Sequence, residues 1–180
     1  MTILETKGLR KVYGSGETEV RALDGVDLSV EKGEFAAIVG TSGSGKSTLL
    51  HMLGGLDRPT EGTVTVDGHE LSRLKEEELT IFRRRKIGFV FQNYNLVPVL
   101  SVYENIVLPI QLDGSRPDQA YVNQIIQTLG LTQKLSSLPG QLSGGQQQRV
   151  AIARALAAKP AIILADEPTV SSALRTAALR

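Results

Sequence analysis

The sequence contains no cysteine, no long hydrophobic run and no large excess of charge of either sign. Without cysteine the chain forms no disulfides and holds no metal through thiolates, which weakly favours a reducing compartment. No apolar run approaches the roughly 18 residues of a membrane span. Residues 1–14 also lack the apolar core of a signal peptide. If the protein works at a membrane, a partner has to hold it there.

The charge balance argues against a nucleic-acid partner. Lysine and arginine number 20 against 19 acidic residues, so the net charge of +1 leaves no global footprint for nucleic acid, and we expect no nucleic-acid partner. A hydrophobic content of 41% is ordinary for a soluble globular protein. The 180 residues suffice for one domain with a core, with or without a small insert.

The stretch GTSGSGKST carries the strongest chemical signal in the sequence. It follows an apolar run predicted to be a strand, Glu34–Val39, and leads into a segment with helical character. A strand, a loop with the spacing G-x-x-x-x-G-K-S and a helix make up a phosphate-binding P-loop. The predicted nucleotide-binding residues are Gly40, Thr41, Ser42, Gly43, Ser44, Gly45, Lys46, Ser47 and Thr48.

Each residue type in this loop has a chemical reason to be there. Gly40, Gly43 and Gly45 let backbone N–H groups approach an anion, because no Cβ blocks the way. The following helix directs its unpaired N–H groups to the same point. Lys46 supplies a charge for the β- and γ-phosphates of a nucleotide, and Ser47 supplies a hydroxyl for Mg²⁺. The alternative, a flexible Gly/Ser loop, does not explain why all these parts coincide.

Two apolar runs end in polar residues that are candidates for the same site. IGFVFQ, residues 87–92, is a predicted strand ending at Gln92, and AIILA, residues 161–165, is followed by Asp166 and Glu167. The carboxyl ends of parallel strands face the ligand in α/β sheets. Asp166 would therefore hold Mg²⁺, and Glu167 would orient the attacking water. The alternatives are solvated strand-end acids and a glutamine without a role.

Two further features have more than one interpretation. Ser143, Gly144, Gly145 and Gln146 open a long helical pattern, with Ser143 as the N-cap. This start is either a capped helix with a flexible entry or a second phosphate contact. Tyr13, in a polar glycine-rich loop, is either a plain loop aromatic or a stacking face for adenine. Local chemistry leaves both questions open.

The rest of the chain divides into short predicted elements. Strands are predicted at 2–9, 18–30 and 63–66, and helices at 75–86, 116–136 and 144–159, with turns at Asp67–Gly68 and over residues 54–62. The basic run at 83–86 is interpreted as a solvated helix end that complements the helix dipole, rather than an RNA or membrane patch. Pro98 and Pro109 are expected to limit regular helix in the apolar connector after Gln92.

Residues 142–156, LSGGQQQRVAIARAL, resemble the signature motif of ATP-binding-cassette (ABC) ATPases. The motif lies between the P-loop and IILADEP in that family's order and spacing. Gln92 matches the family's Q-loop, and Tyr13 matches its adenine-stacking aromatic. The stretches TLLHMLGGLDRPTEGTV and FRRRKIGFVFQNYNL resemble the bacterial branch that includes lipoprotein-release, macrolide-export, antimicrobial-peptide-export and cell-division ATPases.

The resemblance implies the fold. It is α/β, with a P-loop NTPase core sheet, an antiparallel β subdomain and an inserted α-helical subdomain over approximately residues 93–158. Residues 1–180 would form one ABC ATP-binding domain whose C-terminal core is incomplete. Its ligands would be ATP and Mg²⁺, with Ser47, Gln92 and Asp166 at the metal.

The resemblance also implies the assembly. Two copies would pack head to tail, so that the P-loop of one copy and the Ser143–Gln146 helix end of the other enclose each ATP. Gln92 would contact Mg²⁺ or the attacking water. The segment with Tyr94, Leu96 and Val97 would dock an integral-membrane permease, which places the protein in the cytoplasm on the inner face of the membrane. ATP would join the dimer, and hydrolysis by Glu167 would release it.

The sequence departs from the family pattern after ADEPT. Val170 and Ser171 intervene there, and Arg175 follows where the family's short loop ends in aspartate. The chain stops before the family's switch histidine, which neither His51 nor His69 matches. We therefore expect a chain truncated or altered near residue 170, with weak ATP binding and poor hydrolysis. The alternatives are a non-catalytic remnant that binds nucleotide only and a cell-division-type regulatory ATPase.

Overall fold

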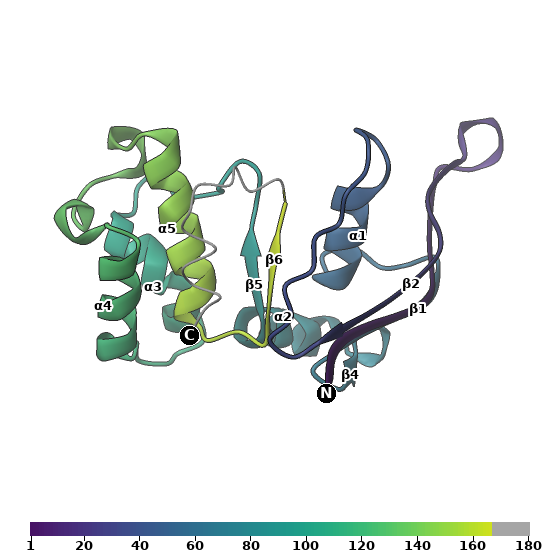
Figure 1. The fold of residues 1–180 in the computed structure, drawn as a ribbon, viewed down its shortest axis with the longest axis horizontal. Helices are drawn as coiled ribbons and strands as arrows, with labels where there is room; N and C mark the ends of the chain where they lie inside the picture. The colour runs from purple at the N-terminus through teal and green to yellow at the C-terminus, as the bar shows by residue number, and fades with distance from the viewer. Residues whose placement is uncertain (167–180) are drawn as a thin grey trace. The chain divides into compact units, whose positions relative to one another are not determined.

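The computed structural model describes residues 1–166 (Figure 1). The backbone contacts divide the chain into two compact units, the first from Met1 to Arg83 and the second from Arg84 onward. The first unit contains an antiparallel sheet and the phosphate loop, and the second contains a parallel strand pair and most of the helices. The architecture is therefore α/β with an antiparallel sheet and a helical part, as the sequence predicts.

Four strands form the sheet of the first unit, in the order β2-β1-β3-β4. Their bounds are β1 Thr2–Tyr13, β2 Val20–Glu31, β3 Glu61–Val66 and β4 His69–Glu70. β1 runs beyond its predicted end because it pairs with β2 along its whole length, up to Tyr13 opposite Val20. The predicted Asp67–Gly68 turn joins β3 to β4 with φ values of 47° and 76°, which suit a two-residue hairpin.

Two helices complete the first unit. They are α1 Lys46–Leu53 and α2 Glu76–Lys86, with short 3₁₀ turns at Gly16–Thr18 and Leu71–Arg73. α2 reaches across the boundary at Arg83. Strands and helices both contribute to the buried apolar side chains of the unit, which include Leu9, Met52, Leu53, Val64, Val66 and Leu79. α1 is thus fixed by its apolar face, which leaves its N-terminus free to carry the loop.

The strand predicted at Glu34–Val39 is not formed, so this prediction was wrong for the described structure. Neither sheet within residues 1–166 includes the segment. The side chains of Phe35 and Val39 are 75% and 89% exposed. An apolar composition favours a buried strand, but a strand also needs a hydrogen-bonded neighbour, and composition does not supply one.

The second unit is built around a parallel strand pair and three helices. Its elements are β5 Ile87–Val90, α3 Val102–Leu112, α4 Gln119–Thr128, the 3₁₀ turns Thr132–Lys134 and Pro139–Gln141, α5 Gly144–Ala157 and β6 Ile162–Ala165. Ile87 pairs with Ile162 and Val90 with Ala165. The core is aliphatic and includes Val102, Ile106, Val107, Val122, Leu131 and Val150, all fully buried. The helices predicted at 116–136 and 144–159 are confirmed with changed bounds, and α3 is a further helix that the sequence did not predict.

Two of those bounds have clear local causes. α3 continues through Pro109, contrary to the prediction that prolines limit helix here. Proline has a helical φ and removes one hydrogen bond, while this helix starts with a full capping box between Ser101 and Glu104. α4 is shorter than predicted because Gly130 adopts a φ of 64°, the left-handed conformation that ends helices.

The basic run at the end of α2 makes specific contacts rather than forming a solvated helix end. Arg83 donates to the Gly55 carbonyl (2.6 Å) in the first unit. In the second unit Arg84 donates to the Leu112 carbonyl (2.8 Å), and Nε of Arg85 donates to both carboxylate oxygens of Asp113 (2.9 and 3.0 Å). These arginines therefore tie α2 to the ends of other helices within their own units.

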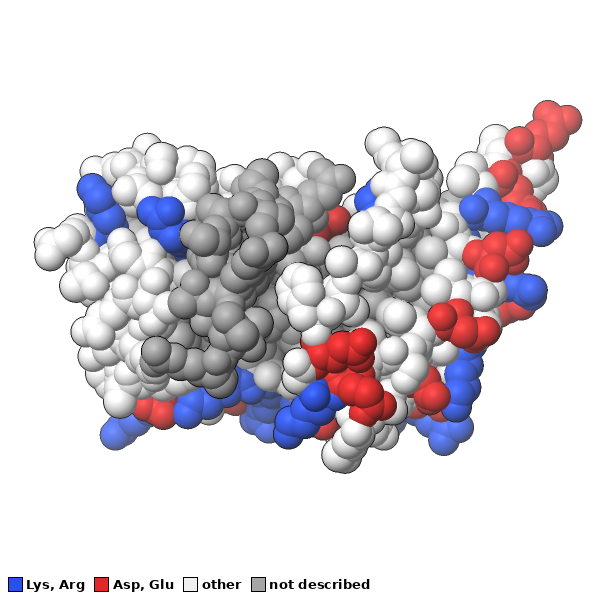
Figure 2. All heavy atoms as spheres, viewed as in Figure 1, with Lys and Arg blue, Asp and Glu red and all other residues white. Residues whose placement is uncertain are grey.

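Surface charges of both signs are interspersed on the strands β1 and β2 (Figure 2). Arg10 forms ion pairs with Asp24 and Glu61, and Arg21 pairs with Glu19. Such exposed pairs contribute little stability each. Among the helices of residues 1–166, none is long and apolar enough to cross a bilayer.

Candidate functional site

Gly45 fixes the conformation of the predicted phosphate loop. It is the N-cap of α1 and has a φ of 86°. A Cβ at this position would lie 2.3 Å from the carbonyl oxygen of Ala22 on β2, a distance that real side chains do not reach. Leu49 donates to the Gly45 carbonyl (2.8 Å) as the first helical hydrogen bond. Only glycine therefore allows the loop to turn into the helix this close to the sheet.

Lys46, the first residue of α1, extends its side chain back to the start of the phosphate loop. Its ammonium donates to the carbonyl oxygens of Gly40 (2.9 Å) and Thr41 (2.7 Å). An ammonium carries three N–H donors, and these contacts use two of them. The loop residues 40–44 are exposed, so an anion can reach them. A fixed positive charge, exposed loop amides and the N-terminus of α1 thus meet at one point, which is the arrangement that binds phosphate.

Tyr13 belongs to the same unit and lies at the end of β1. Its hydroxyl donates to Oδ2 of Asp57 (3.0 Å), and the Lys11 ammonium lies 4.8 Å from the ring centroid. Burial and the Asp57 carboxylate raise the pKa of the Tyr13 hydroxyl above its ordinary value, against smaller opposing effects of Lys11 and Thr48. Tyr13 keeps 41% of its surface exposed, so it can still meet a ligand.

Gln92 and Asp166 follow neighbouring strand ends in the second unit. Val90 and Ala165, the last residues of β5 and β6, are paired, and the Asp166 amide donates to the Val90 carbonyl (2.9 Å). β5 ends two residues before its predicted end because a turn begins at Phe91, whose carbonyl accepts from the Tyr94 amide (3.0 Å). Asp166 is buried, with only 9% of its surface exposed. The predicted catalytic residue Glu167 lies outside the described residues, as does everything after it.

The start of α5 has the capping geometry that the sequence predicts. Ser143 is the N-cap: its Oγ accepts from the Gln146 amide (3.3 Å), and its own amide donates to Oε1 of Gln146 (2.8 Å). Gly144 and Gly145 are exposed at the first two helical positions. The helix therefore presents an open, small-residue N-terminus, which fits both a plain cap and an anion contact.

Sequence reasoning missed Arg154, which organises the turn after Gln92. Arg154 projects from α5 and donates to the carbonyl oxygens of Tyr94 (2.7 Å) and Asn95 (2.6 Å). Both acceptor residues have positive φ values, 59° and 47°, which cost conformational energy in non-glycine residues. Burial lowers the pKa of the Arg154 guanidinium. The available signal was a basic residue inside the apolar pattern of a helix.

Asn105 was missed in the same way. It is fully buried on α3, and its amide group donates to the carbonyls of Val97 (3.1 Å) and Leu100 (2.9 Å) while accepting from the Val97 amide (2.8 Å). A buried polar side chain needs such partners. Asn105 therefore shapes the loop that leads from the Gln92 turn to α3.

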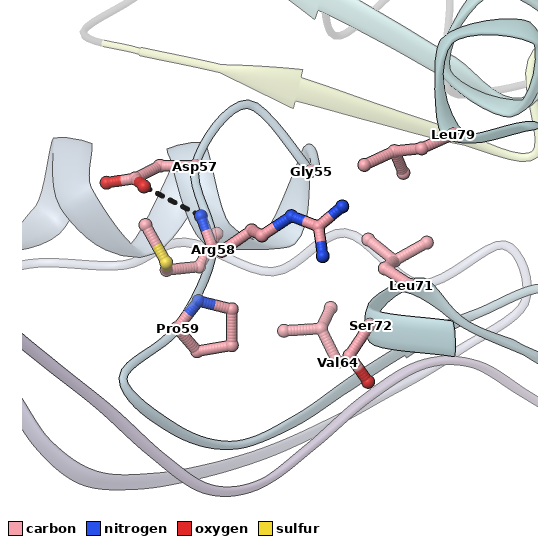
Figure 3. A pocket seen from close by; sticks show the side chains of 9 residues that line it. Gly55, Asp57, Arg58, Pro59, Val64, Leu71, Ser72 and Leu79 are labelled. Atoms are coloured by element: carbon pink, nitrogen blue, oxygen red, sulfur yellow. Dashed lines mark hydrogen bonds between the residues drawn. The ribbon is translucent and has the colours of Figure 1, made fainter. Parts of the chain in front are cut away.

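A small pocket in the first unit is not the nucleotide site (Figure 3). It is lined by Met52, Gly55, Asp57, Arg58, Pro59, Val64, Leu71, Ser72 and Leu79. Figure 3 shows aliphatic side chains around most of it, with the Asp57 carboxylate turned to the backbone nitrogen of Arg58. Its volume of about 20 Å³ suits one water molecule and excludes a nucleotide.

Comparison with other proteins agrees with this geometry. A family model described as ABC transporter matches residues 23–170. The chain therefore belongs to the ABC transporter family, as an ATP-binding cassette, and members of this family hydrolyse ATP.

Its relatives carry informative names. An uncharacterized ABC transporter ATP-binding protein of Thermotoga maritima is 52% identical, over 93% of this chain and 72% of its own length. The lipoprotein-releasing system ATP-binding protein LolD of Geobacter metallireducens is 47% identical, over 97% of this chain and 79% of its own length. The macrolide export ATP-binding/permease protein MacB of Hyphomonas neptunium is 51% identical, over 93% of this chain and 26% of its own length.

One solved structure is especially relevant. It is described as a dimeric post-hydrolysis state of the ATP-binding cassette MJ0796 bound to ADP and Pi. Its TM-score is 0.85 at 46% identity, and the match covers 94% of this chain and 77% of that one.

Proposed function

We propose that this chain is the ATP-binding subunit of an ABC exporter, which binds Mg·ATP and, in the intact family form, hydrolyses it in a head-to-tail dimer to drive a membrane permease. The observation that carries the proposal is the geometry of the first unit, where Lys46 and the N-terminus of α1 meet at the phosphate loop and Asp57 anchors Tyr13 at the end of β1. A lysine and helix amides suit a triphosphate, and an anchored aromatic suits a base.

The catalytic roles follow the chemistry of each residue. Ser47, Gln92 and Asp166 supply oxygen ligands of the kind Mg²⁺ prefers. Glu167 would orient the attacking water, and Gln92 would contact Mg²⁺ or that water. The pairing of β5 and β6 supports a common role for Gln92 and Asp166, because it joins the strand ends that they follow.

A second copy completes each site in this proposal. The signature residues Ser143, Gly144, Gly145 and Gln146 of one copy contact the phosphates held by the loop of the other. The exposed glycines of α5 support this role, as does the dimeric form of the MJ0796 cassette. Residues 93–158, which include α3, α4 and α5, act as the helical subdomain that carries this contact, within a single ABC domain.

A membrane permease is the second partner. The name of the MacB relative joins an ATP-binding and a permease part in one protein, and that of LolD describes a lipoprotein-releasing system. The segment with Tyr94, Leu96 and Val97 would dock the permease and hold the chain at the cytoplasmic face of the membrane. The same names favour export or extraction as the driven step.

A complementation experiment tests the head-to-tail arrangement. Lys46→Ala disables the phosphate loop, and Gly144→Asp places a negative charge at the signature face. Aspartate suits the first turn of a helix, and a Cβ at position 144 meets nothing closer than 3.7 Å, so the second variant should fold. A mixed pair contains one intact site, formed by the loop of the Gly144→Asp copy and the signature of the Lys46→Ala copy.

We expect ATP-dependent association in sedimentation runs of the wild type and of the mixture, but of neither variant alone. Wild-type association without any association in the mixture would contradict the head-to-tail site. Association of the Lys46→Ala variant alone with ATP would contradict the role of the loop.

A further inference from the structure

The end of β1 and the turn after α1 converge on one carboxylate. Lys11 and Tyr13 are two residues apart on β1 and share a face of the strand. Lys11 donates to Oδ1 of Asp57 (2.8 Å), and the Tyr13 hydroxyl donates to Oδ2 of Asp57 (3.0 Å). Lys11 also donates to the Arg58 carbonyl (2.8 Å). Both carboxylate oxygens are thus used by the same strand.

The turn that carries Asp57 is itself fixed to β1. The Arg58 amide donates to Oδ1 of Asp57 (2.7 Å), and the Thr60 amide donates to the Arg10 carbonyl (2.9 Å). The Val12 amide donates to the Thr60 hydroxyl (3.0 Å). The carboxylate therefore has a defined position before any ligand binds.

These contacts constrain the aromatic ring at two points. Asp57 holds its hydroxyl, and the Lys11 ammonium lies over the ring, 4.8 Å from the centroid. The Lys11 side chain is only 13% exposed, so it is enclosed on this side. A cation on one face of an aromatic ring leaves the opposite face for a stacking partner.

We infer that Asp57, together with Lys11, is a positioning residue that orients Tyr13 to stack on the base of a nucleotide. This inference rests on the nucleotide binding proposed above. Asp57 itself touches the tyrosine and not the nucleotide. A ring that is already fixed does not have to lose conformational entropy when the nucleotide binds. For one side chain, this saving corresponds to roughly a 2- to 10-fold higher affinity for the nucleotide.

The test compares a ligand that has a base with one that lacks it. Calorimetry measures binding of Mg·ATP and of magnesium tripolyphosphate to the wild type, Asp57→Asn and Tyr13→Phe. The matched control is Glu5→Gln, because Glu5 also pairs with a lysine of β1, Lys7. Circular dichroism confirms that each variant is folded.

We expect Asp57→Asn and Tyr13→Phe each to weaken Mg·ATP binding roughly 2- to 10-fold and to leave tripolyphosphate binding unchanged. The double variant should lose no more than either single one, because both remove the same contact. Glu5→Gln should bind both ligands like the wild type.

A second readout does not depend on the nucleotide. The four tyrosines can be followed by NMR as their hydroxyls titrate, with Tyr13 assigned from the Tyr13→Phe spectrum. Burial and the Asp57 carboxylate both raise the pKa of Tyr13, so Asp57→Asn should lower it toward the value that burial alone gives. An unchanged Tyr13 titration overturns the positioning role.

The remaining outcomes separate this inference from the proposed function. Equal loss of both ligands in Asp57→Asn, or no loss of either, overturns the positioning role while nucleotide binding stands. A folded wild type that binds neither ligand overturns the proposed function, and the inference falls with it.

Discussion

Two glycines of the phosphate loop, Gly43 and Gly45, differ in whether they can accept a side chain, although they look alike in the sequence. Gly43 and Gly45 both have positive φ values, 79° and 86°. A Cβ at Gly43 would meet open space, whereas at Gly45 it would meet the Ala22 carbonyl at 2.3 Å. The sequence motif predicts glycine at position 45, and the structure gives the reason, namely the proximity of β2.

We therefore expect Gly45→Ala to destabilise the protein by about 2–4 kcal/mol, from backbone strain plus a collision with the backbone. Gly43→Ala is the matched control and should cost about 1–2 kcal/mol from strain alone. Urea unfolding of the two variants measures both values. Equal losses of unfolding free energy in the two variants would show that the collision with the Ala22 carbonyl does not contribute to the destabilisation.

Asp113 gives a prediction about pH. The hydrogen bond from Arg85 lowers the pKa of Asp113 below its ordinary value of 3.8, with burial opposing and Ser115 and Arg84 assisting. A lowered pKa in the folded state stabilises the protein above the unfolded-state pKa. That contribution is lost as the pH falls through the lower, folded-state value.

The Asp113→Asn variant should therefore be less stable than the wild type at pH 6–7, and the difference should shrink as the pH falls below about 4. Urea unfolding of both proteins between pH 7 and 3 measures it. A stability difference that does not change with pH would mean that Asp113 acts by packing and not by charge.

At the scale of elements, the periodic segments were predictable and the connections were not. The helices at α1, α2 and α5 and the Asp67–Gly68 hairpin follow from apolar spacing, the Ser143 cap and turn residues. The segment Glu34–Val39 shows the limit: its composition suits a strand, but pairing is a property of neighbours. The passage of α3 through Pro109 shows that a capped, well-buried helix overrides a local breaker.

The turn after Gln92 depends on a contact between distant residues. Arg154 on α5 holds the Tyr94 and Asn95 carbonyls, 60 and 59 positions away in the chain. Sequence periodicity cannot reveal such a pair. Replacing Arg154 with methionine leaves two carbonyls without their charged donor and should free this strained turn.

We expect Arg154→Met to speed hydrogen exchange of the amides at residues 93–97 about 10- to 100-fold, while amides of α4 exchange as before. Arg154→Lys keeps the charge but lacks the two-pronged donor geometry, so it should give an intermediate effect. Uniform acceleration throughout the second unit would instead indicate general destabilisation.

At the scale of the whole molecule, the motifs predicted the family more fully than local chemistry predicted the site. The P-loop, Gln92, the signature motif and Asp166 lie in the order of an ABC cassette, and the family model and relatives confirm that membership. Local reasoning could not have found Asp57 or Arg154, because their importance lies in what they touch. Val170 and Arg175, where the sequence departs from the family pattern, lie outside the described residues. Their effect on ATP binding and hydrolysis therefore stays a prediction.

The whole account depends on the phosphate loop holding the triphosphate of ATP. The most direct measurement is a calorimetric titration of Mg·ATP into the wild type, the Lys46→Ala variant and a Lys7→Ala control, each shown to be folded. Lys7 is an exposed lysine whose partner is Glu5, outside the loop. We predict saturable binding to the wild type and to Lys7→Ala, and at least a tenfold weaker binding to Lys46→Ala, since a charged hydrogen bond contributes about 1.5–3 kcal/mol. Equal affinities for all three proteins, or no binding to any of them, would contradict the claim that the phosphate loop holds the triphosphate of ATP.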